Sequence, residues 1–480
     1  MSVLSPEIVH RPAGSQAAPL SIAIDCAANA GPVNPFVWGV GAPDKYHWWP
    51  ENKQLIARIR QAKIKLVRVN PIQLMLSTGR DPYPAPGDWV LGDMDRALKT
   101  IFDAGAQPLF VVAGLPKGVA RGADAAGYLD RVDWNEYGRF LRGVVERYNV
   151  RHVLGVGRTV KYWEMWNEPS IEGDGKFATM ESYGEFVKTV GGAMKSADPA
   201  ISLVGPAAPW SDLSPSGWTA YAAKNLADQL DILSWHDYGP GPGHSDGDVL
   251  DWPKPHYEDN VNTVRSGAGQ AFVGPDGKRY GAAITEYNIS WQDGGEGYNR
   301  TYHSHLNTVY VASAIAHAMR ARAAMFCVYN LAETGKNHLG MLANTDYAPY
   351  EPFHVVELLG RHFGDEMLPS SSGDPRIDCA VSQERSSGRI FAFLVNRDPG
   401  AARDLALRLD HSRLRHPAAR AWSIAPEGVR SQPCAPISGA AVRYRLPPYG
   451  IVCIEVSGNL TPEPFKRQTA KGATRTARSR

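Results

Sequence analysis

The sequence has little of several features that would assign it to a class at once. Its 480 residues carry 51 lysines and arginines against 49 aspartates and glutamates, a formal net charge of +2. So balanced a charge excludes a general electrostatic attraction to nucleic acid or membranes. No uninterrupted apolar run approaches the ~18 residues of a membrane span, and the N-terminus lacks the apolar segment of a secretory signal. We therefore expect a soluble, cytoplasmic protein.

Cysteine is also scarce. The chain has five, they are far apart, and no two form a C-x-x-C pair. An odd and scattered set favours a reducing compartment over a disulfide framework, which agrees with a cytoplasmic location. The five are Cys26, Cys327, Cys379, Cys434 and Cys453.

Cofactor-binding motifs are missing as well. The sequence has no Walker loop and no G-x-S-x-G elbow, and "GVGAPDKYHWW" does not supply the G-x-G-x-x-G turn that an open doubly wound sheet would need. We expect no organic cofactor. His303 and His305 in "YHSHLN" are two residues apart on an expected helix and point in different directions, so we also expect no metal.

What the sequence does contain is an alternation of short apolar runs and longer stretches of helical period, from about residue 34 to residue 364. This pattern is typical of a parallel sheet wrapped in helices. Eight such runs with amphipathic stretches between them predict a closed (β/α)8 TIM barrel. The runs are residues 36–42, 65–70, 107–114, 160–167, 202–207, 230–238, 281–288 and 323–329.

The pattern changes after the barrel. Short alternating segments between proline, glycine and charged turns predict a C-terminal antiparallel β-sandwich over residues 365–457, which completes an α/β fold with an accessory domain. We expect residues 1–33, which contain "LSIAIDCA", to add a strand to this sandwich. Residues 458–480 are basic with few large apolar groups, so they predict a disordered, solvated tail rather than a nucleic-acid site.

Polar residues stand where several expected barrel strands end, and the loops at those ends form the site in barrels of this kind. Glu168 closes the fourth strand and Glu286 the seventh, about 120 residues apart. Both should face the same mouth of the barrel. Two facing carboxyl groups are what acid/base and nucleophilic work at a glycosidic bond requires. The other strand-end residues are Arg68, Asn70, Asn167, His236, Asp237, Tyr238, Tyr287 and Asn288.

Each carboxylate has an alternative role as the partner of an arginine inside the barrel. We expect this role for Glu164, four residues before Glu168, because a carboxylate in the middle of a strand needs a buried partner. Two other functions are open: a carbohydrate-binding barrel without catalysis, and a sugar lyase or isomerase. The second would favour a phosphate-binding glycine turn after strands seven and eight, and the sequence has no convincing one.

Four segments carry a family resemblance. "WNEPS" at Trp166 to Ser170 resembles the acid/base signature of the retaining glycoside hydrolases of clan A. "ITEYNISW", which begins at Ile284, resembles the nucleophile segment of family thirty-nine, the family of β-xylosidases and related enzymes. "SWHDYG" and "LPPYGIVCIEV" are similar to its strand-six segment and to the closing strands of its accessory sandwich. The resemblance covers most of the chain.

The resemblance implies an activity and two catalytic residues. It implies hydrolysis of β-linked oligosaccharides or polysaccharides by double displacement, with Glu168 as general acid and base and Glu286 as nucleophile. Asn167 would hydrogen bond to the sugar 2-hydroxyl. The expected partner is therefore a carbohydrate, and the sequence leaves the sugar, the cleavage mode and the oligomeric state open.

Three further residues have implied supporting roles. Tyr238 and Arg68 match positions that hold the nucleophile ionised and correctly oriented, because a nearby cation and a phenolic donor both favour the charged form. His236 either belongs to the same network or is a structural histidine beneath the site.

Aromatic residues are frequent in the expected strand-end loops. Flat ring faces suit sugar subsites, although part of this set is expected to pack in the core. The candidates are Tyr46, His47, Trp48, Trp49, Trp210 and Trp291. The segment "FCVYNLAETGKNHLG" departs from the tryptophan-containing one of the family's xylosidases, and in it Tyr329, Asn330 and Glu333 are candidates for sugar contacts.

Overall fold

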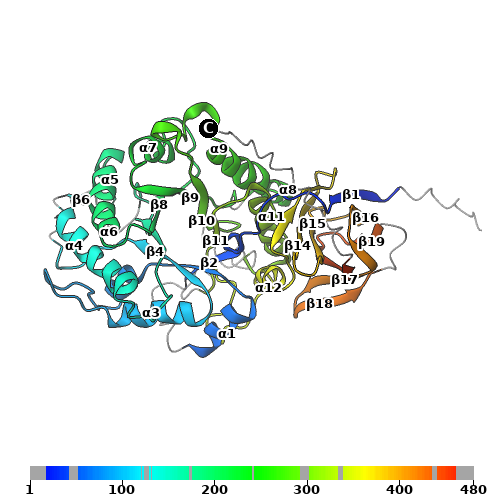
Figure 1. Ribbon diagram of the computed structural model, residues 1–480, viewed down its shortest axis with the longest axis horizontal. Coiled ribbons are helices and arrows are strands. Elements are labelled where there is room, and N and C mark those ends of the chain that lie inside the picture. Colours follow the sequence, from blue (N-terminus) through cyan, green and yellow to red (C-terminus); the bar gives the residue numbers. More distant parts are fainter. Residues whose placement is uncertain are drawn as a thin grey trace, which may run out of the picture.

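The computed structural model describes most of the chain as a barrel joined to a β-sandwich (Figure 1). The described residues are 18–42, 52–119, 122–123, 129–130, 132–171, 176–240, 243–291, 302–332, 339–434 and 441–460. Among them, no helix has the length and apolar character needed to cross a membrane.

Eight parallel strands close into a barrel in the order β10, β11, β2, β3, β4, β7, β8, β9. The eight strands predicted from the sequence are all present. They are β2 (Gly39–Gly41), β3 (Leu66–Val69), β4 (Gln107–Val112), β7 (Tyr162–Met165), β8 (Ser202–Ala208), β9 (Leu230–His236), β10 (Gly281–Tyr287) and β11 (Met325–Val328). A short ribbon, β5 (Gly122–Ala123) and β6 (Leu129–Asp130), lies outside the barrel sheet.

Helices surround the barrel (Figure 1), and several pass into π-helical turns. One of the amphipathic stretches between the predicted strands, residues 134–149, is α-helical only to Val145 and then continues as a π-helical turn. The helices are α1 (Lys53–Gln61), α2 (Pro71–Ser77), α3 (Gly92–Asp103), α4 (Trp134–Val145), α5 (Met180–Phe186), α6 (Gly192–Ala197), α7 (Trp218–Asn225), α8 (Asp246–Asp251), α9 (Asn260–Ser266), α11 (His305–Ala321) and α12 (Phe353–Arg361). The π-helical turns are η3 (Glu146–Val150), η4 (Val187–Gly191) and η5 (Lys254–Asp259).

The C-terminal part consists of two packed sheets. One has the order β12, β14, β15, β20, β17, β18 and the other β13, β1, β16, β19. Their strands are β1 (Leu20–Asp25), β12 (Glu366–Leu368), β13 (Ser370–Ser371), β14 (Ile377–Gln383), β15 (Ile390–Asn396), β16 (Arg403–Asp410), β17 (Leu414–Ala425), β18 (Gly428–Pro433), β19 (Ala441–Leu446) and β20 (Ile451–Leu460). Apolar side chains from both sheets, such as Ile22, Leu407 and Ile454, fill the space between them.

Two details of this sandwich differ from the sequence-based expectation. β1 pairs in parallel with β16, so the sandwich is not wholly antiparallel. β20 continues past residue 457 to Leu460, because Leu460 pairs with Leu414 of the long strand β17. The remaining residues of the predicted tail, 461–480, lie outside the described part of the chain.

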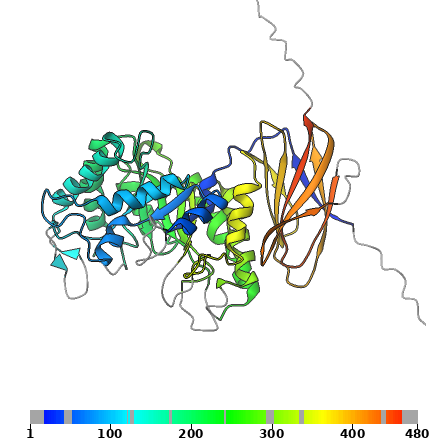
Figure 2. The same ribbon diagram turned by 90° about the horizontal axis from the view of Figure 1, so that it is seen from below.

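The sandwich packs against barrel helices α11 and α12 (Figures 1 and 2). Phe391 and Phe393 of β15 belong to the same apolar core as the barrel.

A chain of charges of alternating sign crosses this interface, with His317 of α11 at its centre. His317 Nε2 lies 3.1 Å from Asp378 of β14, and its Nδ1 lies 2.5 Å from Glu258 of η5. The chain runs Asp251, Arg397, Asp378, His317, Glu258, Arg320.

Candidate active site

Glu168 lies in a strained turn three residues beyond the end of β7. Its φ is +43°, and that of Trp166 is +79°. Side chains other than glycine hold such conformations at a cost of about 1–3 kcal/mol each, so the surroundings must impose them. The N–H of Glu168 donates to the carbonyl of Ala207 in β8 at 3.0 Å. β8 therefore holds the turn from which the Glu168 side chain projects.

Glu286 lies near the end of β10, opposite His236 of β9, and the pairing shifts register between Ile284 and Glu286. Irregularities of this kind re-aim a side chain. One carboxylate oxygen of Glu286 accepts from Arg68 Nη1 at 2.6 Å, and the other accepts from the Tyr238 hydroxyl at 2.7 Å. Burial alone would raise the pKa of Glu286, but His236, Arg68 and Tyr238 outweigh it and lower the pKa. Glu286 is therefore held as a carboxylate.

Arg68 of β3 connects four side chains of the site. Its Nε donates to Glu164 at 2.5 Å, and its Nη2 donates to the Asn167 amide oxygen at 2.6 Å. Glu164 is fully buried, so the predicted structural pairing of this carboxylate with an arginine is confirmed. Because the side-chain amide oxygen of Asn167 accepts from Arg68, the NH2 group of this amide is oriented away from the Arg68 guanidinium.

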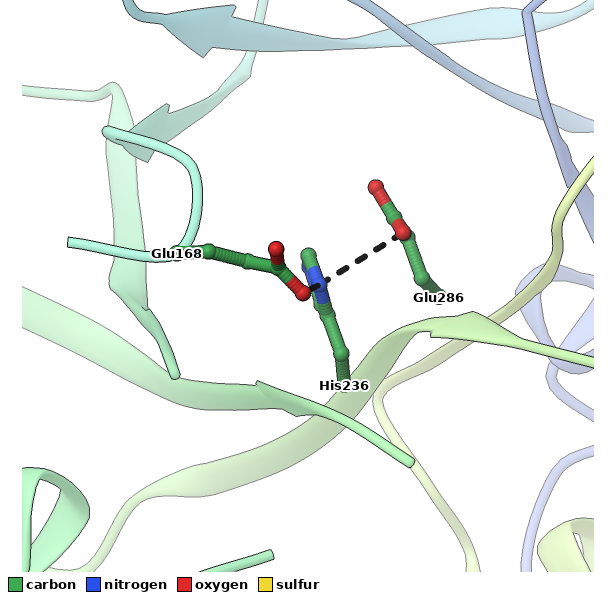
Figure 3. Close-up of side chains that lie close together, drawn as sticks. All are labelled: Glu168, His236 and Glu286. Carbon is green, nitrogen blue, oxygen red and sulfur yellow. Dashed lines mark hydrogen bonds and ion pairs between the residues drawn. The ribbon is translucent and has the colours of Figure 1, made fainter. Parts of the chain in front are cut away.

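His236 lies between the two glutamates (Figure 3). Its Nδ1 is 2.8 Å from Glu168 and 3.5 Å from Glu286, and its Nε2 is 3.4 Å from Arg68 Nη2. Burial lowers the pKa of His236, but the two carboxylates more than compensate and raise it. Because Nδ1 faces carboxylate oxygens, it carries a proton and donates. The structure thus places His236 within the network rather than beneath it.

The spacing of the two carboxyl groups defines the chemistry they can perform together. One oxygen of Glu168 and one of Glu286 lie within 4.8 Å of each other. Carboxyl groups about 5–5.5 Å apart belong to retaining glycosidases, whereas inverting enzymes need about 6.5–9.5 Å to admit a water molecule. The gap suits direct attack by one carboxylate while the other handles a proton.

Glu168, His236 and Glu286 also form the arrangement among the described residues that could hold a metal ion. A divalent cation there would lie beside the buried guanidinium of Arg68, which is 2.6 Å from Glu286. Like charges at such distances repel strongly. The set of donors therefore suits a neutral sugar better than a cation.

The other predicted site residues are less closely connected. Trp291, four residues after β10, has 65% of its surface exposed, and Trp210 after β8 has 54%. Tyr329 follows β11 directly and is half-buried. Trp48 and Glu333 lie outside the described residues, as do Tyr46, His47 and Trp49.

Ser234 of β9 was not among the site residues predicted from the sequence. This fully buried hydroxyl donates to Glu164 at 3.0 Å. The strand alternation was an available signal, since residues 234, 236 and 238 share one face of an extended segment.

A closed parallel barrel with two facing strand-end glutamates, one of them preceded by an asparagine, is the arrangement of a barrel-type glycoside hydrolase. The model of the family described as "Glycosyl hydrolases family 39" matches residues 23–318. The chain belongs to this family.

Known proteins agree with this assignment. A β-xylosidase of Geobacillus stearothermophilus is 23% identical over 235 residues. That match covers 46% of this chain and 45% of the xylosidase, so the chain spans slightly less than half the length of this relative.

Solved structures share the fold. CelM2, a bifunctional glucanase-xylanase from a metagenome library, superposes with a TM-score of 0.68 and 15% identity over 92% of this chain and 100% of its own. A monomeric β-xylosidase from Caulobacter crescentus CB15 gives a TM-score of 0.66 and 14% identity over 91% of this chain and 99% of its own. At such identities the likeness concerns the fold alone.

Proposed function

We propose that the protein is a retaining O-glycoside hydrolase that cleaves β-linked sugars by double displacement. The observation that carries the proposal is the distance of at most 4.8 Å between oxygens of Glu168 and Glu286. Family membership and the lowered pKa of Glu286 agree with it. A barrel that only bound carbohydrate would have no need for two carboxyl groups at this spacing.

In the first step, a carboxylate oxygen of Glu286 attacks the anomeric carbon while the glycosidic C–O bond breaks. Glu168 gives its proton to the departing oxygen, so that an alcohol leaves and a glycosyl ester remains on Glu286. His236 donates to one oxygen of Glu168 and leaves the other for this proton. Arg68 and Tyr238 keep Glu286 ionised before the attack.

In the second step, Glu168 acts as a base. It takes a proton from water, whose oxygen attacks the same carbon and displaces the Glu286 carboxylate. Two displacements on opposite faces return the anomeric configuration of the substrate. The NH2 group of Asn167 is the donor for the sugar 2-hydroxyl, and this bond strengthens as positive charge develops on the ring.

The substrate class we propose is a β-xyloside or a related β-linked oligosaccharide or exopolysaccharide. It rests on the family and on the relative named as a β-xylosidase. Exposed indoles are costly to leave in water, and Trp210 and Trp291 follow the strands on either side of β9, so we assign both as stacking platforms for sugar rings.

A stereochemical experiment tests the proposal. The protein is first screened on aryl β-xyloside, β-glucoside, β-galactoside and α-arabinofuranoside, and on β-linked polysaccharides. Hydrolysis of the best substrate is then followed by proton NMR of the anomeric signal. We expect the sugar released first to have the configuration of the substrate, before mutarotation. Release of the inverted anomer, or no hydrolysis of any glycoside or polysaccharide offered, would reject it.

A further inference from the structure

Ser234 occupies the point where two hydrogen-bond paths from the candidate catalytic residues meet. It lies on β9, two residues before His236, and is fully buried. Its hydroxyl donates to Glu164 Oε1 at 3.0 Å. The hydroxyl oxygen of Ser234 in turn accepts from the backbone N–H of Ala207 at 3.0 Å. One small group therefore satisfies an ionised side chain and a backbone donor at the same time.

The first path leads from Ser234 to the nucleophile. Glu164 uses its second oxygen, Oε2, to accept from Arg68 Nε at 2.5 Å. Arg68 then donates to Glu286 and to Asn167, both at 2.6 Å. Because a guanidinium is rigid and planar, fixing its Nε fixes where its two Nη groups point. The hydroxyl of Ser234 thereby fixes the carboxylate that sets the plane of Arg68.

The second path leads from Ser234 to the acid/base residue. Ala207 has a φ of +54°, a left-handed conformation that requires support. Its N–H is held by Ser234, and its carbonyl accepts from the N–H of Glu168, whose own φ is +43°. The same hydroxyl thus anchors Ala207 of β8 directly and, through the carbonyl of Ala207, the strained Glu168 in the turn after β7.

We infer that Ser234 is a positioning residue that sets the relative placement of Glu168 and Glu286, through Ala207 on one side and through Glu164 and Arg68 on the other. The inference rests on the proposed function. A hydroxyl suits this role because it donates one hydrogen bond and accepts others within the volume of a single oxygen. Alanine would leave both Glu164 and the N–H of Ala207 without this partner.

The test compares Ser234→Ala with Ser234→Thr and with the control Ser382→Ala. Ser382 is also fully buried and accepts a backbone N–H, from Gly364 at 2.8 Å, but lies on β14 of the sandwich. On an aryl glycoside that the wild type hydrolyses, Ser234→Ala should lower kcat by about 10- to 100-fold, the worth of a hydrogen bond to a charged group, with little change in KM. Ser234→Thr should recover most of this loss, and Ser382→Ala should retain wild-type kcat.

Two leaving groups separate the two paths. Dinitrophenyl glycosides need no proton from Glu168, whereas phenyl glycosides do. We expect Ser234→Ala to lose activity on both, because the Arg68 path acts on every substrate, and to lose more on the phenyl glycoside. When Glu168 is already replaced by alanine, the additional loss that Ser234→Ala causes on the phenyl glycoside should disappear, since the effects of substitutions at coupled residues do not add.

The outcomes are distinct. If the wild type hydrolyses glycosides and a folded Ser234→Ala variant has a kcat within threefold of the wild-type value, the inference is overturned and the proposed function is left intact. A folded Ser234→Thr as inactive as Ser234→Ala, or equal losses in Ser234→Ala and Ser382→Ala, would do the same. If Ser234→Ala does not fold, the comparison is made on Ser234→Thr: a folded Ser234→Thr with wild-type kcat and leaving-group ratios supports the inference, and a folded Ser234→Thr that has lost activity overturns it. Inactivity of the wild type would instead reject the proposed function.

Discussion

Tyr238→Phe removes one hydrogen-bond donor from Glu286, the proposed nucleophile, and leaves the rest of the site in place. The Tyr238 hydroxyl donates to Glu286 at 2.7 Å, inside the barrel mouth. Burial and the carboxylate of Glu286 keep the pKa of Tyr238 well above its ordinary value, so the hydroxyl remains a donor. The hydrogen bond favours the ionised form of Glu286, and its loss must raise the pKa of that carboxyl.

The size of the rise in the pKa of Glu286 follows from the energy of the hydrogen bond that Tyr238→Phe removes. A hydrogen bond to a charged group contributes about 1.5–3 kcal/mol. At about 1.36 kcal/mol per pKa unit, its removal raises the pKa of Glu286 by about 1 to 2 pH units. Arg68 still holds the other oxygen at 2.6 Å, so Glu286 stays ionised near neutral pH. The acid limb of the kcat/KM profile should therefore move to higher pH by that amount, with activity below the limb lower by about 10- to 100-fold.

The assay is a pH profile of kcat/KM on an aryl glycoside with a good leaving group. Tyr287→Phe is the matched control, because Tyr287 is the next residue to Glu286 and its buried hydroxyl has no hydrogen-bond partner among the described residues. Its profile should keep the wild-type acid limb. An unmoved limb in Tyr238→Phe, or equal movement in both variants, would refute this account of how Glu286 is kept ionised.

Three further predictions address other parts of the molecule. Glu168→Ala should lower kcat by about 10² to 10⁴ on phenyl glycosides and much less on dinitrophenyl glycosides, and equal losses on both would reject its role as the acid. His317→Gln should lower the free energy of unfolding by about 3–5 kcal/mol near pH 6. Glu258 and Asp378 raise the pKa of His317 against the effect of burial. The charged His317 therefore stabilises the fold fully below the pKa that it has in the unfolded chain, and this stabilisation is lost as the pH rises through its pKa in the folded protein. The free energies of unfolding of the wild type and His317→Gln, measured in urea, should converge at alkaline pH. A difference between them that does not change with pH would contradict a charged His317. Trp291→Ala should change the free energy of unfolding by less than about 0.5 kcal/mol, because the side chain is 65% exposed, yet raise KM for oligosaccharides more than for aryl glycosides.

The barrel could be predicted because each strand is a short apolar run, a signal carried locally by the sequence. Every predicted run contains the observed strand or most of it, as residues 202–207 do for β8 (Ser202–Ala208). The short strands β12 and β13 and the polar edge strand β18 were not predicted. A segment such as "GVRSQP" has no apolar alternation, and pairing with β17 decides its conformation.

The candidate site was predictable to the extent that it lies at strand ends. Glu168 and Glu286 could be paired from the topology of a barrel, and Glu164 from the cost of burying a charge. Ser234 was not found, because serine is common and its importance arises from its neighbours across β7 and β8. The left-handed conformation of Ala207 is likewise imposed by tertiary contacts, since nothing in "VGPAAPW" requires it.

The central claim is that Glu286 bonds covalently to the sugar. A 2-fluoro glycoside with a good leaving group, of the sugar that the enzyme prefers, slows the second step more than the first. Peptide mass spectrometry after incubation should then place one fluoroglycosyl group on Glu286, and none should be found in Glu286→Gln, which should be folded and inactive. Hydrolysis of the parent glycoside without any covalent adduct, or a label on Glu168 instead, would contradict the mechanism.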